Sequence, residues 1–408
     1  MHIAYYAPSW PPGESANGIV TYVRYMRDEL ISTGHAVTVV SGDTAYFDDG
    51  TSTTVPTTWK ARVERKAATL LDGGRVPLPG TAYQLGRVFR TVHQRRPIDV
   101  IEMEESFGWP PYVQQRIDVP LVTRLHGPHF LAQQSFAEKL SQADDLRISA
   151  EGRAIRGARA VTAPSSAVLR QTLDRYNAVP SLSRWISNPI APAPTSRRWD
   201  LTRCNPFAFL MVGRFDQRKG ADLALQAMEI VCRQEPRARL TLVGPDSGIE
   251  VGGRKRKFEE YCREHLSPAA RASIRFLGSV GPQELSELRL DSLAALLCSR
   301  WENLSYALTE AMAMGCPIVT TRSHEDDVVK HGETALVAQR SDPQILANHM
   351  LLLMKKPALA QVLGQNAFAQ CVRLYSPPVV ADTTLAFYRE VLMFSDDPRR
   401  WHSPKSNP

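Results

Sequence analysis

The stretch that decides the fold leads from a short apolar run into a basic turn, and it reads Val212-Gly213-Arg214-Phe215-Asp216-Gln217-Arg218-Lys219-Gly220. The preceding run, Phe207–Val212, has the length and apolar composition of a buried strand. Gly213 ends that strand, and a helix is expected to begin near Lys219. A strand followed directly by a helix is the first half of a βαβ unit, so this stretch predicts an α/β fold.

The same alternation of short apolar runs and longer amphipathic stretches continues through both halves of the chain. One helical stretch is Val20–Ile31, where apolar residues recur near helical spacing and Gly34 supplies a stop. The predicted strands are His2–Ala7, Ala36–Ser41, Ile98–Met103, Leu121–Leu125 and Ala160–Ala163 in the first half, and Phe207–Val212, Leu240–Val243, Ile274–Leu277, Leu293–Cys298 and Pro317–Thr320 in the second. This pattern predicts a parallel sheet in each half.

Length and proline content together predict two domains. A chain of 408 residues is too long for one hydrophobic core. The proline-rich residues 189–206 cannot continue a helix or a central strand, so they are expected to form a linker between a first domain, 1–188, and a second domain, 207–376. Residues 377–395 are expected to form a helix that can cross back to the first domain, and residues 396–408 a disordered tail.

Composition narrows the class of protein. Lysine and arginine exceed aspartate and glutamate by 49 − 42 = 7, and the isoelectric point near 9.1 favours an anionic partner. No zinc-finger, helix-turn-helix or ribonucleoprotein pattern accompanies this charge, so nucleic acid is not expected. The six cysteines show no Cys-x-x-Cys spacing and are expected to be reduced thiols. Neither a signal peptide nor a transmembrane segment is evident, which predicts a cytoplasmic protein.

Arg214 and Lys219 are candidates for binding phosphate. Neither a Gly-x-Gly-x-x-Gly fingerprint nor a P-loop is present, so phosphates must be held in another way. A guanidinium can bind two phosphate oxygens at once, an ammonium adds a compact charge, and the start of a helix adds free N–H groups. Open α/β sheets bind ligands at the carboxyl ends of their strands, where this segment is placed. The alternative is a solvated basic turn.

Two carboxylates follow the predicted strand Leu293–Cys298. Glu302 is expected in the loop after the strand, and Glu310 in the next helix, so both can face one crevice. Carboxylates accept strong hydrogen bonds from sugar hydroxyls. The alternative is one exposed glutamate in a loop and another on a helix surface.

The two segments together resemble a known family. The spacing Glu-x7-Glu of Glu302 and Glu310, followed by Ala-Met-Ala-x-Gly-x-Pro-Ile-Val, is similar to the retaining family 4 glycosyltransferases, and Gly-Arg-x4-Lys-Gly resembles their diphosphate-binding segment. The resemblance implies the α/β fold named GT-B, in which two Rossmann-like domains face each other across a cleft. The first domain would bind the acceptor and the second the nucleotide-sugar donor. Donor binding would then close one domain on the other.

The resemblance also assigns residues. His126, in a His-Gly pair at a predicted strand end, would approach the donor sugar, whereas the alternative is a structural histidine. Gly18 would abut the diphosphate, although Asn17 departs from the Gly-Gly pair of the family. The implied catalytic residues are Arg214, Lys219, Glu302 and His126. The implied donor-binding residues are Gly18, Gly213, Arg214, Lys219, Glu302, Asn303, Leu304, Ser305, Tyr306, Ala307 and Glu310.

The implied mechanism needs no protein nucleophile. The nucleoside diphosphate leaves with help from Arg214 and Lys219, and the acceptor attacks the same sugar face, so the anomeric configuration is retained. No metal and no cofactor are expected, since these cations occupy the metal's role; Asp48-Asp49 and Glu325-Asp326-Asp327 have the wrong pattern for a metal-binding Asp-x-Asp. The donor would be a UDP- or GDP-linked sugar, and the acceptor a glycan, a lipid-linked molecule or a small molecule.

Other interpretations remain open at this point. A nucleotide-sugar epimerase of the same architecture, or an inactive scaffold that binds a sugar nucleotide, would use a similar phosphate site. Glu104-Glu105-Ser106 could contact an acceptor or form a solvated loop. A basic and partly apolar stretch in the first domain predicts either contact with an anionic membrane on its inner face or an ordinary solvated helix surface. It comprises Trp59, Lys60, Arg62, Arg65, Lys66, Leu70 and Leu71, followed by Arg87, Val88, Phe89, Arg90, Arg95 and Arg96.

Overall fold

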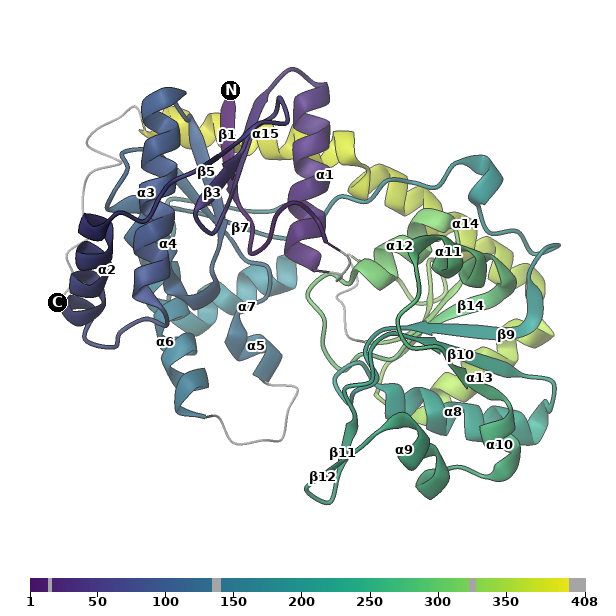
Figure 1. Ribbon diagram of the computed structural model, residues 1–408. Helices are drawn as coiled ribbons and strands as arrows, with labels where there is room; N and C mark the ends of the chain where they lie inside the picture. Colours follow the sequence, from purple (N-terminus) through teal and green to yellow (C-terminus); the bar gives the residue numbers. More distant parts are fainter. Residues whose placement is uncertain (14–16, 134–140, 323–327, 396–408) are drawn as a thin grey trace. The chain divides into compact units, whose positions relative to one another are not determined.

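The chain folds into two compact α/β units in the computed structural model, which describes residues 1–13, 17–133, 141–322 and 328–395 (Figure 1). Among the described residues, unit 1 comprises those of 1–189 together with 377–395, and unit 2 comprises those of 190–376. Two expectations fall outside the described residues, namely the acidic run Glu325-Asp326-Asp327 and the disordered tail 396–408.

Unit 1 is built on one sheet in the order β4-β3-β2-β1-β5-β6-β7-β8. Its strands are β1 (His2–Tyr6), β2 (Ala36–Ser41), β3 (Thr44–Tyr46), β4 (Ser52–Thr54), β5 (Val100–Glu104), β6 (Leu121–Arg124), β7 (Ala160–Ala163) and β8 (Leu182–Trp185). The pairs β2–β3 and β3–β4 are antiparallel and the others are parallel. The chain reverses its direction of growth between β1 and β5, so the carboxyl ends of these two strands form a switch point for ligand binding.

Helices cover both faces of this sheet. They are α1 (Gly18–Ser32), α2 (Trp59–Asp72), α3 (Pro79–Arg95), α4 (Pro110–Gln114), α5 (His129–Gln133), α6 (Gln142–Gly157), α7 (Ser166–Tyr176) and α15 (Pro377–Ser395), with a 3-10 turn η1 (Ser106–Gly108). Ile3 and Tyr5 of β1 pack with α1 and α15 on one face, whereas Ala4 and Tyr6 pack with α3 and α4 on the other. This alternation follows from the two-residue period of a strand.

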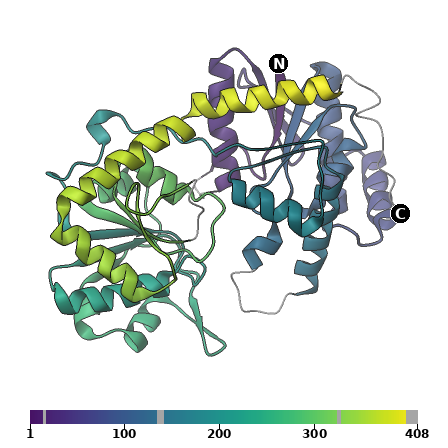
Figure 2. The same ribbon diagram turned by 180° about the vertical axis from the view of Figure 1, so that it is seen from behind.

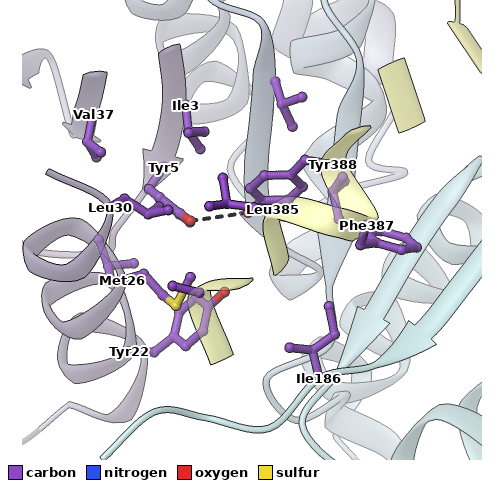
Figure 3. Packing of buried hydrophobic residues seen from close by; sticks show 14 of the residues in the cluster. Ile3, Tyr5, Tyr22, Met26, Leu30, Val37, Ile186, Leu385, Phe387 and Tyr388 are labelled. Carbon is purple, nitrogen blue, oxygen red and sulfur yellow. Dashed lines mark hydrogen bonds between the residues drawn. The ribbon is translucent and has the colours of Figure 1, made fainter. Parts of the chain in front are cut away.

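The last helix belongs to the core of unit 1. Leu385, Phe387 and Tyr388 of α15 are buried among residues of α1 and β1 (Figure 3), and the helix runs along this unit in the reverse view (Figure 2). Each such side chain contributes about 1.5–3 kcal/mol when it is fully buried. Arg184 of β8 also pairs with Glu390 of α15 at 3.0 Å. The hydrophobic face of α15 therefore fixes it to the first sheet.

Unit 2 contains a parallel sheet in the order β13-β10-β9-β14-β15-β16 and a separate hairpin, β11–β12. The strands are β9 (Asn205–Val212), β10 (Arg239–Val243), β11 (Ile249–Val251), β12 (Arg254–Arg256), β13 (Ile274–Phe276), β14 (Ser292–Leu297), β15 (Ile318–Thr321) and β16 (Leu336–Ala338). The helices are α8 (Ala221–Gln234), α9 (Phe258–His265), α10 (Pro268–Ala272), α11 (Pro282–Asp291), α12 (Tyr306–Met314), α13 (Pro343–Lys355) and α14 (Pro357–Tyr375). The switch point of this sheet lies between β9 and β14.

Most of the proline-rich passage, predicted as a linker, is hydrogen-bonded to unit 2. Ile190 N donates to Tyr375 O, Ala193 N to Ala313 O and Trp199 N to Met314 O, each at 2.8 Å. The Trp199 ring is buried and donates through Nε1 to Ser292 O. Prolines prevent a regular element here, but the remaining N–H groups find partners on a neighbouring surface. The same passage contains a 3-10 turn, η2 (Thr195–Arg197).

All six cysteines are free and buried. Among the helices that the structure describes, none is long and apolar enough to cross a bilayer.

Candidate functional site

The loop between β9 and α8 is organised by Asp216. Its two carboxylate oxygens accept hydrogen bonds from Lys219 N at 2.7 Å and from Arg214 Nε at 2.8 Å. The Arg214 side chain remains 48% exposed and lies directly after Gly213 at the end of the strand. Asp216 therefore shapes the turn and orients the guanidinium, a role that the sequence analysis did not assign.

Gly220 allows the start of α8 to approach the end of β14. Its φ is +69°, a left-handed value, and a Cβ atom built there would lie 1.8 Å from Cys298 O. Only glycine adopts this φ without strain and also lacks the Cβ atom that would collide with Cys298 O. The approach brings the basic loop next to the residues that follow β14.

Glu302 is the point where the two segments meet. Its Oε1 pairs with Lys219 Nζ, lies 3.7 Å from Arg218 Nη1, and accepts a hydrogen bond from Ser299 Oγ at 2.8 Å. The Glu302 side chain is nearly buried, so these charged contacts are only weakly screened by water. Lys219 and Glu302, which were predicted separately, thus form one charged cluster at the carboxyl ends of β9 and β14.

Arg300 also connects the loop after β14 to the segment after β9, and its role was not predicted from the sequence. Its guanidinium donates two hydrogen bonds to the Asp222 carboxylate, at 2.8 and 2.6 Å, and its backbone N donates to Arg218 O at 2.9 Å. A paired Arg–carboxylate contact fixes orientation as well as distance. The spacing of an arginine just after one strand and an aspartate in the first turn of α8 was the available signal.

Glu310 lies on α12, the helix that follows the Glu302 loop, and its carboxylate has a different kind of partner from that of Glu302. Its carboxylate, one-third exposed, pairs with the nearly buried guanidinium of Arg289 on α11. Of the segment between the two glutamates, Leu304 is buried, whereas Asn303, Ser305, Tyr306 and Ala307 are partly exposed. Ser305 precedes α12 and has no side-chain capping bond. The positive end of the α12 dipole therefore lies between Glu302 and Glu310.

His126 follows β6 in unit 1 and is held by its backbone. His126 N and Gly127 N both donate to the Glu105 carboxylate, each at 2.9 Å. The imidazole ring lies edge-on to Tyr22 of α1, with 5.1 Å between ring centroids. Burial, with a smaller effect from Arg124, holds the pKa of His126 well below its ordinary value, so the ring is neutral at neutral pH.

The residues around Glu105 are buried rather than solvated. Burial raises the pKa of Glu104 to about 7, and burial together with the carboxylates of Glu151 and Glu104 raises the pKa of Glu105 to about 8. Ser106 Oγ donates to Glu104 at 2.9 Å, and Arg147 Nε donates to Glu151 at 2.7 Å. The interpretation of Glu104-Glu105-Ser106 as a solvated loop is therefore wrong.

Gly18 is the first residue of α1, after the carboxyl end of β1. Asn17 caps this helix, because its Oδ1 accepts hydrogen bonds from Ile19 N and Val20 N at 2.9 and 3.3 Å. Asn17 has an extended backbone, so its departure from glycine carries no strain. The residue instead satisfies N–H groups at the helix start.

The structure thus brings together Gly213, Arg214, Lys219 and Glu302 in unit 2, with Glu310 on the adjoining helix. Gly18 and His126 belong to unit 1, where both follow strands at the carboxyl edge of the sheet. Within the described ranges, no group of three or more His, Cys, Asp or Glu side chains is arranged to hold a metal ion.

Sequence families match nearly the whole chain. The family described as glycosyl transferases group 1 matches residues 196–370, and the family described as glycosyltransferase family 4 matches residues 16–193. Both matches are to transferases, and neither favours an epimerase.

Individual relatives have low sequence identity to this chain. A D-inositol 3-phosphate glycosyltransferase from Nocardioides sp. is 23% identical over 77% of this chain and 73% of its own length. An alpha-D-kanosaminyltransferase from Streptomyces kanamyceticus is 25% identical over 69% of this chain and 73% of its own length. A glycogen synthase from Mycobacterium tuberculosis is 28% identical, but over only 46% of this chain and 43% of its own length.

Solved structures show the same fold at low identity. A sucrose-phosphate synthase from Thermosynechococcus elongatus superposes with a TM-score of 0.70 at 20% identity, covering 96% of this chain and 99% of the other. HepE from Anabaena, in complex with UDP-glucose, gives a TM-score of 0.64 at 17% identity, covering 96% and 100%. These similarities assign the two α/β units to the GT-B fold.

Proposed function

The chain belongs to the group 1, family 4 glycosyltransferases, and from this premise we propose that it transfers a sugar from a UDP-linked donor to its acceptor with retention of anomeric configuration. The observation that carries the proposal is the charged cluster of Arg214, Lys219 and Glu302 at the switch point of β9 and β14. Open α/β sheets bind ligands at such points. The choice of UDP over GDP is supported by the UDP and UDP-glucose complexes of the structurally similar HepE.

The proposed roles follow from the charges. Arg214 and Lys219 neutralise the negative charge that develops on the leaving diphosphate, so the reaction does not require a metal for that purpose. Glu302 accepts hydrogen bonds from the donor sugar while it holds Lys219 in place. Glu310 binds the ribose. His126 presents a neutral ring toward the sugar from unit 1. Preorganised groups of this kind contribute about 3–4 kcal/mol each to transition-state stabilisation.

Purified protein incubated with UDP-, GDP- and ADP-linked sugars tests the proposal. We expect release of UDP above the rate for GDP or ADP donors, faster with a glycan, lipid-linked or small-molecule acceptor, and unchanged by a chelator. The anomeric configuration of the product, read by NMR, tests retention. An isomerised donor without transfer would support an epimerase instead, and binding without turnover of any donor would support an inactive scaffold.

Replacing both cations tests the site itself. Arg214→Ala with Lys219→Ala should lower kcat by at least about 100-fold, because the diphosphate loses its charge partners. Arg233→Ala on the exposed surface of α8 is the matched control, and it should leave kcat unchanged. Circular dichroism must show that the double variant is folded. Full activity in a folded double variant would overturn the assignment.

We also propose that α2 contacts an anionic membrane surface. Trp59 and Leu70 on this helix are 79% and 81% exposed, and Arg62, Arg65 and Lys66 lie between them in the sequence. Val88 and Phe89 of α3 are buried in the core, so that part of the predicted membrane-binding stretch is wrong.

Trp59→Ala with Leu70→Ala should abolish sedimentation with anionic vesicles. The control is Val179→Ala, which removes an exposed apolar side chain elsewhere in unit 1. Equal sedimentation of both variants would contradict the proposal.

A further inference from the structure

Arg124 on β6, two residues before His126, is completely buried. Its guanidinium donates hydrogen bonds to Ile186 O, Asn188 Oδ1 and Thr162 Oγ1, at 2.8, 2.9 and 3.4 Å. These acceptors are uncharged, and Arg124 Nε has no hydrogen-bond partner within the part of the chain that the structure describes. A buried cation that bonds to uncharged acceptors is costly, so stabilisation of the fold alone does not account for this arginine.

Tyr22 of α1 connects the guanidinium of Arg124 to the ring of His126. Arg124 Cζ lies 4.1 Å from the centroid of the Tyr22 ring, which is a cation–π contact. The His126 ring packs edge-on against the same tyrosine, with 5.1 Å between ring centroids. Tyr22 is buried in the core of unit 1 (Figure 3), where its hydroxyl donates to Glu102 at 2.7 Å. The orientation of the His126 ring therefore depends on Tyr22, and that of Tyr22 on Arg124 and Glu102.

Arg124 also acts on the charge of His126. Burial lowers the pKa of His126, and the positive charge of Arg124 lowers it further. On the neighbouring elements, Glu105 contacts the His126 backbone and Glu102 contacts the Tyr22 hydroxyl. A neutral imidazole can donate one hydrogen bond and accept another, as a sugar hydroxyl also can, whereas an imidazolium only donates.

We propose that Arg124 is a positioning residue for sugar transfer, and that through Tyr22 it fixes the orientation of the His126 ring for contact with the donor sugar. That role rests on the proposed function, in which His126 contacts the sugar. Arg124 is too deeply buried to contact the substrate itself. Its bonds to Ile186 O and Asn188 Oδ1 hold the guanidinium in place from the side of the chain that follows β8.

Substitution of Arg124 tests this role through the ring of His126. NMR resonances of that ring, assigned by comparison with His126→Asn, should show a neutral imidazole in the wild type through the pH range in which ordinary histidines titrate. In Arg124→Gln the ring should titrate at higher pH than in the wild type, and kcat should fall about 10- to 100-fold because the ring is misplaced. The affinity for UDP should not change, since its proposed site is in unit 2.

Two further variants separate charge from orientation and position from stability. Arg124→Lys keeps a positive charge but loses the planar fork, so His126 should stay neutral while kcat still falls. Thr38→Val is the matched control, because it removes a buried hydrogen bond to His2 in the same sheet and should leave kcat unchanged. Should Arg124→Gln not fold, Asn188→Ala removes one acceptor of the guanidinium and should shift the His126 ring resonances and lower kcat.

Unchanged titration of His126 in a folded Arg124→Gln protein would overturn the role, whether or not kcat falls, because the effect would not pass through the ring. Full kcat in that variant would overturn it as well. Failure of the proposed function has a different signature. The wild type would then turn over no donor, while its His126 resonances would still respond to Arg124→Gln.

Discussion

The Glu310 carboxylate is placed so that it can accept hydrogen bonds both from Arg289 and from the ribose of the proposed donor. In the structure its carboxylate pairs with Arg289, whose side chain is nearly buried. That pair leaves the Glu310 carboxylate one-third exposed at the edge of the proposed donor site. A ribose hydroxyl can therefore donate to it without displacing the arginine, since a carboxylate has about four acceptor positions.

Glu310→Gln should weaken the binding of free UDP by about tenfold or more. A hydrogen bond to a charged acceptor contributes about 1.5–3 kcal/mol, and tenfold in affinity is about 1.4 kcal/mol. Isothermal calorimetry measures this directly. Glu287→Gln, on the exposed side of α11, is the control. Identical affinities for wild type and Glu310→Gln would remove Glu310 from the site.

Glu104 makes the stability of unit 1 depend on pH. Unfolded glutamate ionises near pH 4.5, whereas burial raises the pKa of Glu104 to about 7 in the folded protein. Between these values the folded state binds more protons, so the free energy of unfolding falls as the pH rises. Glu105, with a pKa of about 8, acts in the same direction.

Glu104→Gln should reduce that loss of stability by about 1.4 kcal/mol for each pH unit between pH 5 and 7. Glutamine keeps an oxygen for the Ser106 hydroxyl but binds no proton. Hydrogen exchange of β5 peptides along a urea series can measure unfolding of unit 1 alone. Glu259→Gln on α9 of unit 2 should leave the slope unchanged. An unaltered slope in Glu104→Gln would show that Glu104 ionises normally.

Helix α15 is held to unit 1 by a buried polar group as well as by its apolar face. The Glu102 carboxylate accepts hydrogen bonds from Tyr22 of α1 at 2.7 Å and from Tyr388 of α15 at 2.9 Å. Tyr5 and Tyr388 share a further hydrogen bond at 3.2 Å. Burial raises the pKa of Glu102, and the charge of Arg124, followed by the two hydroxyls, offsets part of that effect.

Tyr388→Phe should destabilise unit 1 by about 1–3 kcal/mol, because a buried carboxylate loses a donor. The loss should be measured as faster hydrogen exchange in α1 and α15 peptides. Thr383→Ala is the matched control on the same helix, since that hydroxyl is exposed and donates to Val379 O one turn earlier. A Tyr388→Phe protein as stable as the control would show that apolar packing alone holds α15.

The elements themselves were largely predictable. Every strand expected from apolar runs is present within two residues of its predicted bounds, because buried parallel strands are short, apolar and bounded by turn residues. Some short strands were missed, among them β8, which has a mixed composition, and β16, which has only three residues. Asn205 and Pro206 begin β9 although proline is rare in strands. These segments form strands because they pair with neighbouring strands of the sheet, which local composition does not indicate.

At the scale of the whole molecule, the division into two units predicts which peptides a bound nucleotide should protect from hydrogen exchange. If UDP binds at the β9–β14 switch point, it should slow hydrogen exchange in peptides from residues 205–222 and 299–321. A ligand at 100 times its Kd stabilises the unit that binds it by about 2.7 kcal/mol. UMP, which lacks the second phosphate, should protect less, because Arg214 and Lys219 then lose a partner. Equal protection by UMP and UDP would place the diphosphate elsewhere.

The sequence by itself determined the alternation of strands and helices, the division into two halves, and the basic and carboxylate segments that we propose as the donor site. These follow from local patterns, since apolar periodicity, glycine and proline act over a few residues. Only the tertiary structure decided that Lys219 pairs with Glu302 across 83 residues, that Arg289 pairs with Glu310, and that Glu105 holds the His126 backbone. The physical reason is that such contacts depend on which strands are neighbours in the sheet, and strand order is set by packing of the whole unit rather than by any local stretch.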